Sequence, residues 1–453
     1  MYFVSLKQSR CRVFYICTII FFIVTVSSCD NSSDETPELI IVNPAAQPET
    51  QVVNEINTAA YVYHAENGNR WVKGQGQLPT SNTIDIELPA LPKWLVAAPL
   101  GQQSVWAAVL SDGQVKAYQV SSQGYDEVEI SPSQLQTVTP PVLVVDKTGA
   151  VKLANIFSQD ASPYSSAVVI DKTQGTRAYV ASNGDIVLKT KEDEQRLAVQ
   201  AVNYTRLLID DGQRILALTQ PTLSYDHQVL GSAHENAAAI TLIETTPEFR
   251  KINDIEIASP DIIEGNALIW EDINNDGQRE IIVTLSNQQQ GARIVIFDES
   301  GIELSSSTAI GQSYRWRHQI AVAPFQSADQ LSLVSVRKPH LTASVEYFNL
   351  ADGSMAITDK ALGYTSHLQI SLNIDMGLVG DFDGDGKIEF MLVEQNGAQR
   401  LGAIEYHADD IKLDWTLALD DAITTNIAAT TLLNGTIVLG VGQRNKQLRI
   451  WSP

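Results

Sequence analysis

The chain has 453 residues, of which 44% are hydrophobic and 19% charged, and its formal net charge at pH 7 is −22. This excess of acidic side chains disfavours nucleic acid as a partner, because a protein that binds phosphate needs a basic face. The same acidity suits a solvated surface and the binding of divalent cations.

Residues 1–28 have the composition of an export signal. Lys7, Arg10 and Arg12 precede an apolar run over residues 13–26, and small residues follow it. A basic start, an apolar centre and small residues before a cleavage point are typical of a signal peptide. Its removal takes away three positive charges and no negative ones, so the formal net charge becomes −25.

The segment Val26-Ser27-Ser28-Cys29 resembles the bacterial lipobox. The resemblance implies cleavage before Cys29, lipid on its thiol and amine, and an exported protein that is lipid-anchored to a bacterial membrane, on the periplasmic side or at the cell surface. An ordinary signal peptide that is cut nearby is the alternative. The other two cysteines lie within residues 1–28, so Cys29 is the only cysteine of the mature chain, and no disulfide can form within it.

Residues 29–56 are predicted to form a flexible tether, and residues 57–453 the folded part. The tether is rich in Ser, Asn, Pro, Glu and Thr, a composition that buries too little apolar surface to fold. In the remaining residues, short runs of Val, Ile, Leu and Ala alternate with turns of Gly, Asn, Asp and Ser, and there is little helical periodicity. This pattern predicts an all-β protein.

Three similar units follow one another in the second half of the chain. Their first strands are predicted at residues 267–270, 320–323 and 377–380, and their third strands at 292–297, 343–348 and 401–406. Looser copies start near Trp94, Val142, Tyr204 and Ile427. Repeats of about fifty to sixty residues with four short strands cannot bury both faces alone, so they close radially. We predict a seven-bladed β-propeller, with eight blades left open.

The two ends of the folded part are expected to meet in one blade. Ring closure in a propeller usually borrows a strand from the other terminus. We expect residues 59–63 to complete the final blade, whose last strand is predicted at residues 447–451.

Two acidic loops lie between predicted strands, Asp272 to Glu280 and Asp381 to Glu389. Each has oxygen-bearing side chains at loop positions 1, 3, 5 and 9 and a glycine at position 6. Ca²⁺ takes six to eight oxygen ligands, and the glycine permits the sharp reversal. Apolar runs follow directly, at residues 281–283 and 390–393, so each loop is predicted to be a hairpin rather than an EF-hand. A plain Asp-Gly turn that binds nothing is the alternative.

A degenerate copy of the loop is predicted near residues 327–329, where most of the carboxylates are missing. We expect it to bind no metal.

With these loops and this period, the chain resembles the FG-GAP and VCBS repeat proteins, the β-propeller family that includes integrin α subunits. The resemblance is specific at the two loops and weak elsewhere. It implies two Ca²⁺ ions on the lower face of the propeller, and the Asn in the first loop implies a lower affinity there. The implied ligands are Asp272, Asn274, Asp276, Gln278 and Glu280 in the first loop and Asp381, Asp383, Asp385, Lys387 and Glu389 in the second, with Gln278 and Lys387 acting through their carbonyls.

The positions before the innermost strands predict a binding face on the opposite, upper side of the propeller. Arginine binds carboxylate or sulfate bidentately, Tyr and Trp stack on sugar rings, and His exchanges protons near neutral pH. We therefore expect a protein or an anionic polysaccharide as the partner on this face. The candidate ligand-binding residues are Arg315, Arg317, His318, Tyr364, His367 and Asn426.

Three other interpretations stay open. In the first, His318 and His367 only cap strand ends and Trp316 packs between blades. In the second, the protein is a polysaccharide lyase acting on a uronic-acid glycan, with Tyr314, Arg317, His318 and His367 as the acid–base set. In the third, it is an outer-membrane assembly factor that presents strand edges and loops to partner proteins.

Overall fold

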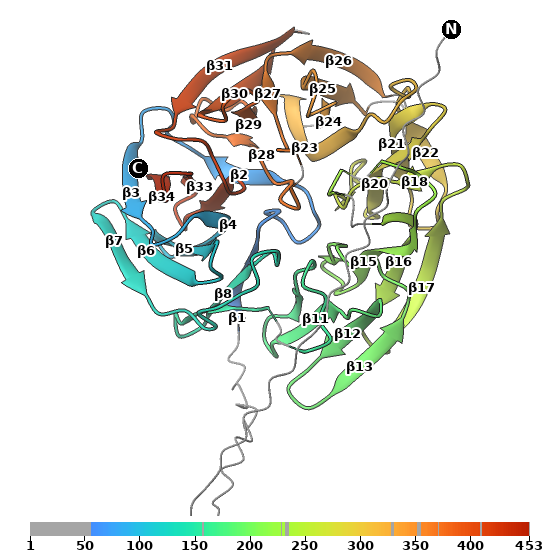
Figure 1. Ribbon diagram of the computed structural model, residues 1–453, viewed down its shortest axis with the longest axis horizontal. Coiled ribbons are helices and arrows are strands. Elements are labelled where there is room, and N and C mark those ends of the chain that lie inside the picture. The colour runs from blue at the N-terminus through green and yellow to red at the C-terminus, as the bar shows by residue number, and fades with distance from the viewer. Residues whose placement is uncertain are drawn as a thin grey trace, which may run out of the picture. The chain divides into compact units, whose positions relative to one another are not determined.

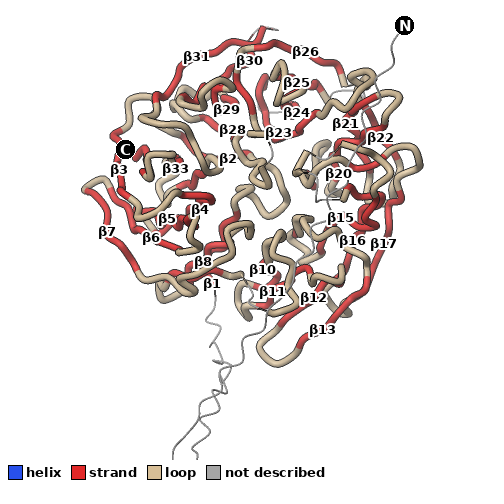
Figure 2. Tube along the Cα trace, viewed as in Figure 1, coloured by secondary structure: helices blue, strands red, loops and turns tan. Residues whose placement is uncertain are grey.

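The computed structural model describes residues 56–155, 158–227, 229–231, 235–327, 330–350, 355–369, 371–407 and 410–452. Every named element in these ranges is a β-strand, and turns and loops connect the strands (Figure 2). No helix in the same ranges is long and apolar enough to cross a membrane. The predicted signal peptide, Cys29 and the tether up to residue 55 lie outside the described residues, as do residues 328 and 329 of the degenerate loop.

The strands form small antiparallel sheets that lie side by side around a common centre (Figure 1). The first sheets in chain order are β4(Pro92–Leu100) with β5(Gln103–Leu110), β6(Val115–Ser121) and β7(Gly124–Val128); β1(Ile56–Tyr61) with β8(Val142–Asp146) and β9(Val151–Leu153); and β10(Val168–Asp171) with β11(Thr176–Val180), β12(Asp185–Lys189) and β13(Glu194–Ala198).

A nine-stranded sheet follows, and it contains two antiparallel meanders. The meanders are joined by a single residue pair between β16 and β18, Ala237 with Ile263. The first consists of β14(Leu208–Ile209), β15(Ile215–Thr222), β16(Asn236–Glu244) and β17(Arg250–Glu256), and the second of β18(Ile262–Ile263), β19(Ile269–Glu271), β20(Glu280–Asn287), β21(Gly291–Phe297) and β22(Glu303–Ser306).

Three further sheets complete the described structure. They are β23(Arg317–Ser327) with β24(Gln330–Arg337), β25(Ser344–Asn349) and β26(Ala356–Ala361); β27(Tyr364–Thr365), β28(Gly377–Asp381), β29(Glu389–Glu394), β30(Arg400–His407) and β31(Asp410–Ala418) together with β2(Trp71–Gln75); and β32(Ala428–Thr431), β33(Ile437–Gly442) and β34(Gln447–Ser452) together with β3(Asn82–Glu87).

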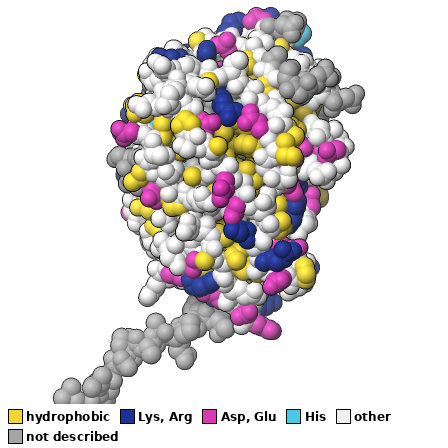
Figure 3. Space-filling view, turned by 90° about the vertical axis from the view of Figure 1, so that its right-hand side faces the viewer, with side chains coloured by type: hydrophobic (Ala, Val, Ile, Leu, Met, Phe, Trp, Pro, Cys, Tyr) yellow, Lys and Arg dark blue, Asp and Glu magenta, His cyan; other side chains and the backbone are white. Residues whose placement is uncertain are grey.

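Burial decreases from the inner to the outer strands, as expected for sheets that pack face to face around a centre. All residues of β20 are buried, whereas those of β13 and β22 are mostly exposed. On the side that carries β17 and β22, acidic, basic and separate hydrophobic side chains are interspersed (Figure 3). Such mixed, charged edges resist pairing with another chain. The molecule is therefore a β-propeller-like all-β protein, and the predicted all-β fold is confirmed.

The predicted third strands and hairpins are confirmed. The three third strands correspond to β21, β25 and β30. Each acidic loop connects two antiparallel neighbours in one sheet, β19 with β20 and β28 with β29.

The prediction for the strand that completes the last sheet is wrong. Residues 59–61 belong to β1, which pairs with β8, whereas β3 pairs with the last strand, β34, from Asn82–Ser452 to Glu87–Gln447. Both segments are short and extended, so their local sequences do not distinguish the edge that each one joins. The last strand itself, predicted at residues 447–451, is confirmed as β34.

Residues 66–76, which we call the central segment, pass between the inner strands of successive sheets. Figure 1 shows this blue stretch running through the middle of the arrangement, from β1 to β2. Backbone N–H groups of the inner strands or adjoining turns donate to it at successive points, Ile209 to Glu66 O at 2.9 Å, Trp270 to Asn67 O at 2.9 Å, Val322 to Asn69 Oδ1 at 3.0 Å and Val379 to Arg70 O at 3.0 Å.

The central segment satisfies backbone groups on inner strand edges that would otherwise be open. Among the named strands of the described residues, its β2 makes the one parallel pairing, with β28. Beyond β2, the N–H of Gly76 donates to Asp381 O at 2.7 Å, and that of Leu78 donates to Phe382 O at 2.9 Å. Because buried backbone groups need partners, the central segment is an integral part of the fold.

The contact between Gly76 and the second acidic loop leaves no room for a side chain. A Cβ on Gly76 would lie 1.9 Å from the carbonyl oxygen of Phe382. We expect Gly76→Ala to lower the free energy of unfolding by about 1–3 kcal/mol, as is typical of overpacking, measured by urea denaturation. Gly212→Ala is the control, since the nearest atom to its Cβ is 3.4 Å away. Equal stability of the two variants would contradict this role of Gly76.

Candidate metal site and central face

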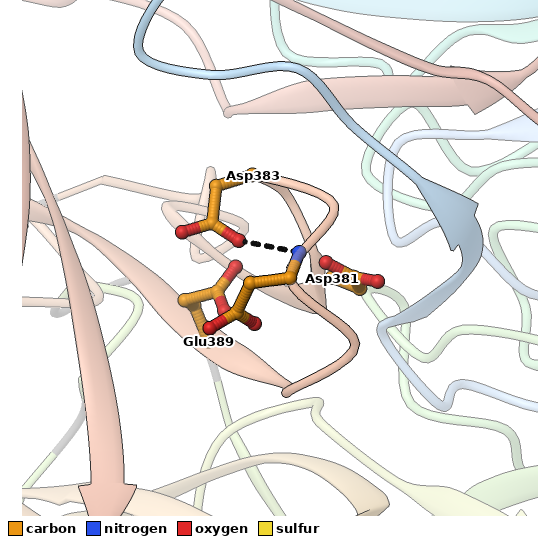
Figure 4. A group of neighbouring side chains, drawn as sticks. Asp381, Asp383 and Glu389 are labelled. Atoms are coloured by element: carbon orange, nitrogen blue, oxygen red, sulfur yellow. Dashed lines mark hydrogen bonds between the residues drawn. The ribbon is translucent and has the colours of Figure 1, made fainter.

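The second acidic loop connects β28 to β29 and brings four carboxylates together. One carboxylate oxygen from each of Asp381, Asp383, Asp385 and Glu389 lies within 4.8 Å of the others. Asp381 ends β28 and Glu389 begins β29, so the pairing of these strands positions both ends of the loop. Figure 4 shows Asp381, Asp383 and Glu389 gathered around the turn. This set of oxygen ligands fits a hard cation such as Ca²⁺.

Backbone N–H groups hold the carboxylates in place. Asp381 accepts from the N–H of Gly384 at 2.7 Å and of Gly386 at 3.2 Å, and Glu389 accepts from the N–H of Phe382 at 2.7 Å. Gly384 and Gly386 have φ angles of 81° and 87°, in the region that favours glycine. A Cβ on Gly384 would also lie 2.7 Å from Gly76 O. The loop shape is thus fixed by two glycines and by the residues that follow β2.

Side chains from neighbouring strands brace the loop. Trp415 Nε1, on β31, donates to Asp383 Oδ2 at 3.2 Å, and Gln75 Nε2, on β2, donates to Asp381 Oδ2 at 3.4 Å. The ammonium group of Lys387 lies 3.0 Å from Asp385 Oδ2 and 2.9 Å from Glu405 Oε1. Lys387 therefore neutralises part of the loop's charge through its side chain, while its predicted role as a carbonyl ligand stays a prediction.

Burial has a strong effect on the acidity of this loop. Burial, together with the negative charges of Asp383, Asp381 and Asp385, raises the pKa of Glu389 to about 9. Burial also raises the pKa of Asp381. Without a cation, Glu389 is therefore protonated at neutral pH. A divalent cation would favour the ionised form, which is the chemistry expected of a cation ligand.

The first acidic loop has a similar backbone but a looser set of side chains. Asn275 and Gly277 have φ angles of 61° and 85°, at the positions of Gly384 and Gly386. Glu280 accepts from the N–H of Ile273 at 2.9 Å, and burial raises its pKa.

Ligands of the first loop bond to the loop itself. Asn274 Nδ2 donates to Glu280 Oε1 at 3.1 Å, the N–H of Asp276 donates to Asp272 Oδ1 at 3.2 Å, and the N–H of Gln278 donates to Asp276 Oδ1 at 2.8 Å. Within the described residues, the group of carboxylates gathered within 4.8 Å belongs to the second loop. A second ion at the first loop stays a prediction.

Three of the predicted face residues have structural partners. The guanidinium of Arg317 is buried against Glu346, with Nε 2.7 Å and Nη2 3.0 Å from its two carboxylate oxygens. The side chain of Asn426 bonds both backbone groups of Leu95, at 3.0 and 2.7 Å. Tyr364 is buried in the sheet of β27–β31. These contacts engage the polar groups of Arg317 and Asn426 within the fold.

The structure brings His318 and His367 together around Trp316. The Trp316 ring stacks on His318 at 4.5 Å and meets His367 edge-on at 5.7 Å. His318 Nδ1 lies 2.8 Å from Ser366 Oγ, and His367 Nδ1 lies 2.9 Å from His340 Nε2. Burial lowers the pKa of His318, and it lowers that of His367 to about 3. Both imidazoles are therefore neutral at physiological pH.

Tyr314 and Arg315 lie at the more accessible edge of this group, with Tyr314 38% exposed. The rings of Tyr225 and His227 flank Tyr314 at 5.3 and 5.6 Å. His227 Nδ1 bonds the buried carboxylate of Glu264. Tyr225, His227 and Glu264 could not be predicted as a group, because no local spacing links residues that meet only through packing of different strands.

Comparison with known proteins gives little information on function. No protein-family model matches the chain, and no curated protein matches it. Among solved structures, a chain of "Crystal Structure of Mitotic Checkpoint Complex" is similar, with a TM-score of 0.41 and 14% identity, over 83% of this chain and 97% of that chain. A similarity at this level carries no argument about what the protein does.

The raised pKa of Glu389 predicts how stability depends on pH in the presence of a chelator. Its folded value, about 9, lies above the ordinary value of 4.5. The folded state therefore holds the proton more tightly than the unfolded state, so this group's contribution is full below pH 4.5 and is lost as pH rises toward 9. The slope is at most about 1.4 kcal/mol per pH unit.

We expect Glu389→Gln to flatten this part of the pH profile, measured by urea denaturation in chelator. Glutamine retains an oxygen that accepts from Phe382 but does not titrate in this range. Glu256→Gln, at an exposed position on β17, is the matched control and should leave the profile unchanged. If the stability of Glu389→Gln falls between pH 5 and 9 as steeply as that of the wild type, the assignment is contradicted.

Proposed function

We propose that the chain is an exported calcium-binding β-propeller protein, anchored to a bacterial membrane through lipid on Cys29, that acts as a binding module for a protein or an anionic glycan. The observation that carries this proposal is the convergence of Asp381, Asp383, Asp385 and Glu389 on one hairpin turn. A divalent cation there would replace the proton that Glu389 holds and would cross-link the two ends of the turn. In this role the ion stabilises the fold and takes no part in a reaction.

We also propose eight blades rather than seven. The strands fall into eight groups when the nine-stranded sheet is divided at its single β16–β18 residue pair. In this arrangement β3 completes the blade of β32–β34, and the ring is closed by hydrogen bonds between β3 and β34. Seven blades would require β14–β17 and β18–β22 to count as one unit, although each is a separate meander.

The positions of the four residues predicted for a lyase support binding rather than elimination. Arg317, His318 and His367 are buried, and Glu346, Ser366 and His340 engage their side chains. General acid–base catalysis needs groups within hydrogen-bond reach of the substrate. Those four residues do not meet this requirement together.

Calcium is expected to raise the melting temperature of the full chain in detergent, as measured by calorimetry. An ion that binds only the folded state adds about 2.7 kcal/mol of stability at about 100 times its dissociation constant. Glu389→Gln should lose most of this rise. Glu280→Gln makes the same change in the first loop and should lose less. A wild-type transition that is identical in calcium and in chelator would refute the calcium site.

Lipid attachment is tested on Cys29. When the chain is produced in bacteria with a clickable fatty acid, the wild type should carry the label and fractionate with membranes. Cys29→Ser should lose both the label and the membrane association, because Cys29 is the only cysteine after residue 28. An unlabelled wild type would favour an ordinary signal peptide.

A further inference from the structure

We call the surface around Trp316, His318 and His367 the central face. A group of aromatic, histidine and acidic side chains on this face has no role in the proposed calcium site. Tyr225, His227 and Tyr314 form a mutually contacting set, with ring centroids 5.3 to 6.1 Å apart. Tyr225 and His227 follow β15, whereas Tyr314 precedes β23. The set is thus assembled from two different strand groups, and we call it the aromatic cluster.

A buried acid orients His227 in this cluster. Glu264 is 3% exposed, and its two carboxylate oxygens bond His227 Nδ1 and Ser286 Oγ. Because Nδ1 is engaged, Nε2 is the ring nitrogen that remains for a ligand, and the side chain of His227 is 29% exposed. Such a second partner fixes the orientation of an imidazole.

Buried polar atoms without partners lie beside the aromatic cluster. Trp316 Nε1, Tyr225 Oη and Asn266 Oδ1 have no hydrogen-bond partner among the described residues, and each of these residues is less than 7% exposed. Gly265, next to Asn266 in the chain, lies against the Trp316 ring, since its Cβ would be 3.1 Å from that ring, and Tyr225 contacts Tyr314. All three atoms are enclosed by protein, so a ligand in front of the cluster does not reach them directly.

Two cationic side chains lie at the edge of the same group. Arg315 follows Tyr314 directly, and the N–H of Lys338 donates to Trp316 O at 2.8 Å. Burial and then the charge of Arg315 lower the pKa of Lys338, which indicates that the two cations are close. Neither forms an ion pair with a carboxylate of the described residues, in contrast to the neighbouring Arg317 and Arg337. Carboxylates far outnumber cations in this chain, yet these two cations have no carboxylate partner in the part of the chain that the structure describes. Two such neighbouring cations favour an anionic ligand.

We propose that this face binds a hexuronic-acid unit of an anionic glycan. The sugar carboxylate lies against Arg315 and Lys338, the ring packs on Tyr314, and a hydroxyl bonds His227 Nε2. The inference rests on the proposed binding function and names its ligand class.

A glycan fits these residues better than a protein surface does. Protein interfaces bury a contiguous apolar core, whereas among the aromatic residues of this group only Tyr314 is well exposed. The other accessible groups are the imidazole of His227 and the two cations. A uronic-acid unit combines a weakly apolar ring face with hydroxyls and a carboxylate, which matches one exposed ring beside an imidazole and two cations.

The test is binding of polygalacturonate to the full chain in detergent, measured by calorimetry, with fully methyl-esterified polygalacturonate as the uncharged ligand. We expect the wild type to bind the acid form at least about tenfold more tightly than the ester. The double variant Arg315→Gln, Lys338→Gln should lose this preference, and Tyr314→Ala should weaken binding of both forms. Lys412→Gln, which removes one positive charge at an exposed position on β31, is the control and should bind like the wild type.

Calcium-dependent melting of the same samples separates this inference from the proposed function. A normal rise with calcium and no binding of polygalacturonate would overturn the glycan site and leave the calcium-bearing module standing. Equal binding by the wild type, the double variant and Tyr314→Ala would overturn it as well. Binding with the expected preference supports the site even if the calcium rise is absent, and an unsaturated, ultraviolet-absorbing product would also support uronate binding here.

Discussion

The fold depends on one buried carboxylate that two arginines share. Asp375 is fully buried, and its oxygens lie 2.9 Å from Arg70 Nη2 and 2.5 Å from Arg206 Nη2. Arg70 also donates to Ile374 O at 3.1 Å, and Arg206 lies over the Tyr63 ring at 5.0 Å. Buried charges are tolerated only with partners, and removing one partner of such a pair typically costs about 3–5 kcal/mol. The triad therefore fixes the central segment against the stretches that lead to β14 and β28, three parts of the chain that are far apart in sequence.

The same segment connects the two candidate sites. Arg70 Nη2 lies 3.5 Å from His318 Nε2, and His318 stacks on Trp316. Six residues further on, Gly76 donates to the carbonyl of Asp381 at the acidic loop. An extended chain of six residues spans about 20 Å, so one continuous stretch reaches from the central face to the cation site. Negative charge is concentrated at one end of this stretch and positive charge borders the face near its other end. The two sites therefore favour different ligands although the chain as a whole is strongly acidic.

The sequence predicts the parts of this structure that are local. The acidic hairpins follow from a pattern within nine consecutive residues, and the strands that flank them follow from short apolar runs. The central segment could not be predicted, because Asn67 and Asn69 look like turn residues and find their partners more than 200 positions away. Arg317 was expected on an open face for a similar reason. Its charge and its position before an innermost strand suggested exposure, and the pairing with Glu346 becomes visible only once β23 and β25 lie in one sheet.

The proposed cation site at the second loop is in direct contact with the central segment. Asp381 contributes its carboxylate to the cluster and its carbonyl to Gly76, and Gln75 donates to the same carboxylate. An ion that orders Asp381 therefore also orders the backbone that leaves β2. Because coupling between two sites is reciprocal, a change that loosens residues 75–78 would also weaken the binding of a cation at the loop. The segment that follows leads into β3, which pairs with the last strand. A cation bound at the loop would therefore act on the pairing of β3 with β34 through the chain that joins β2 to β3, without touching β34 itself.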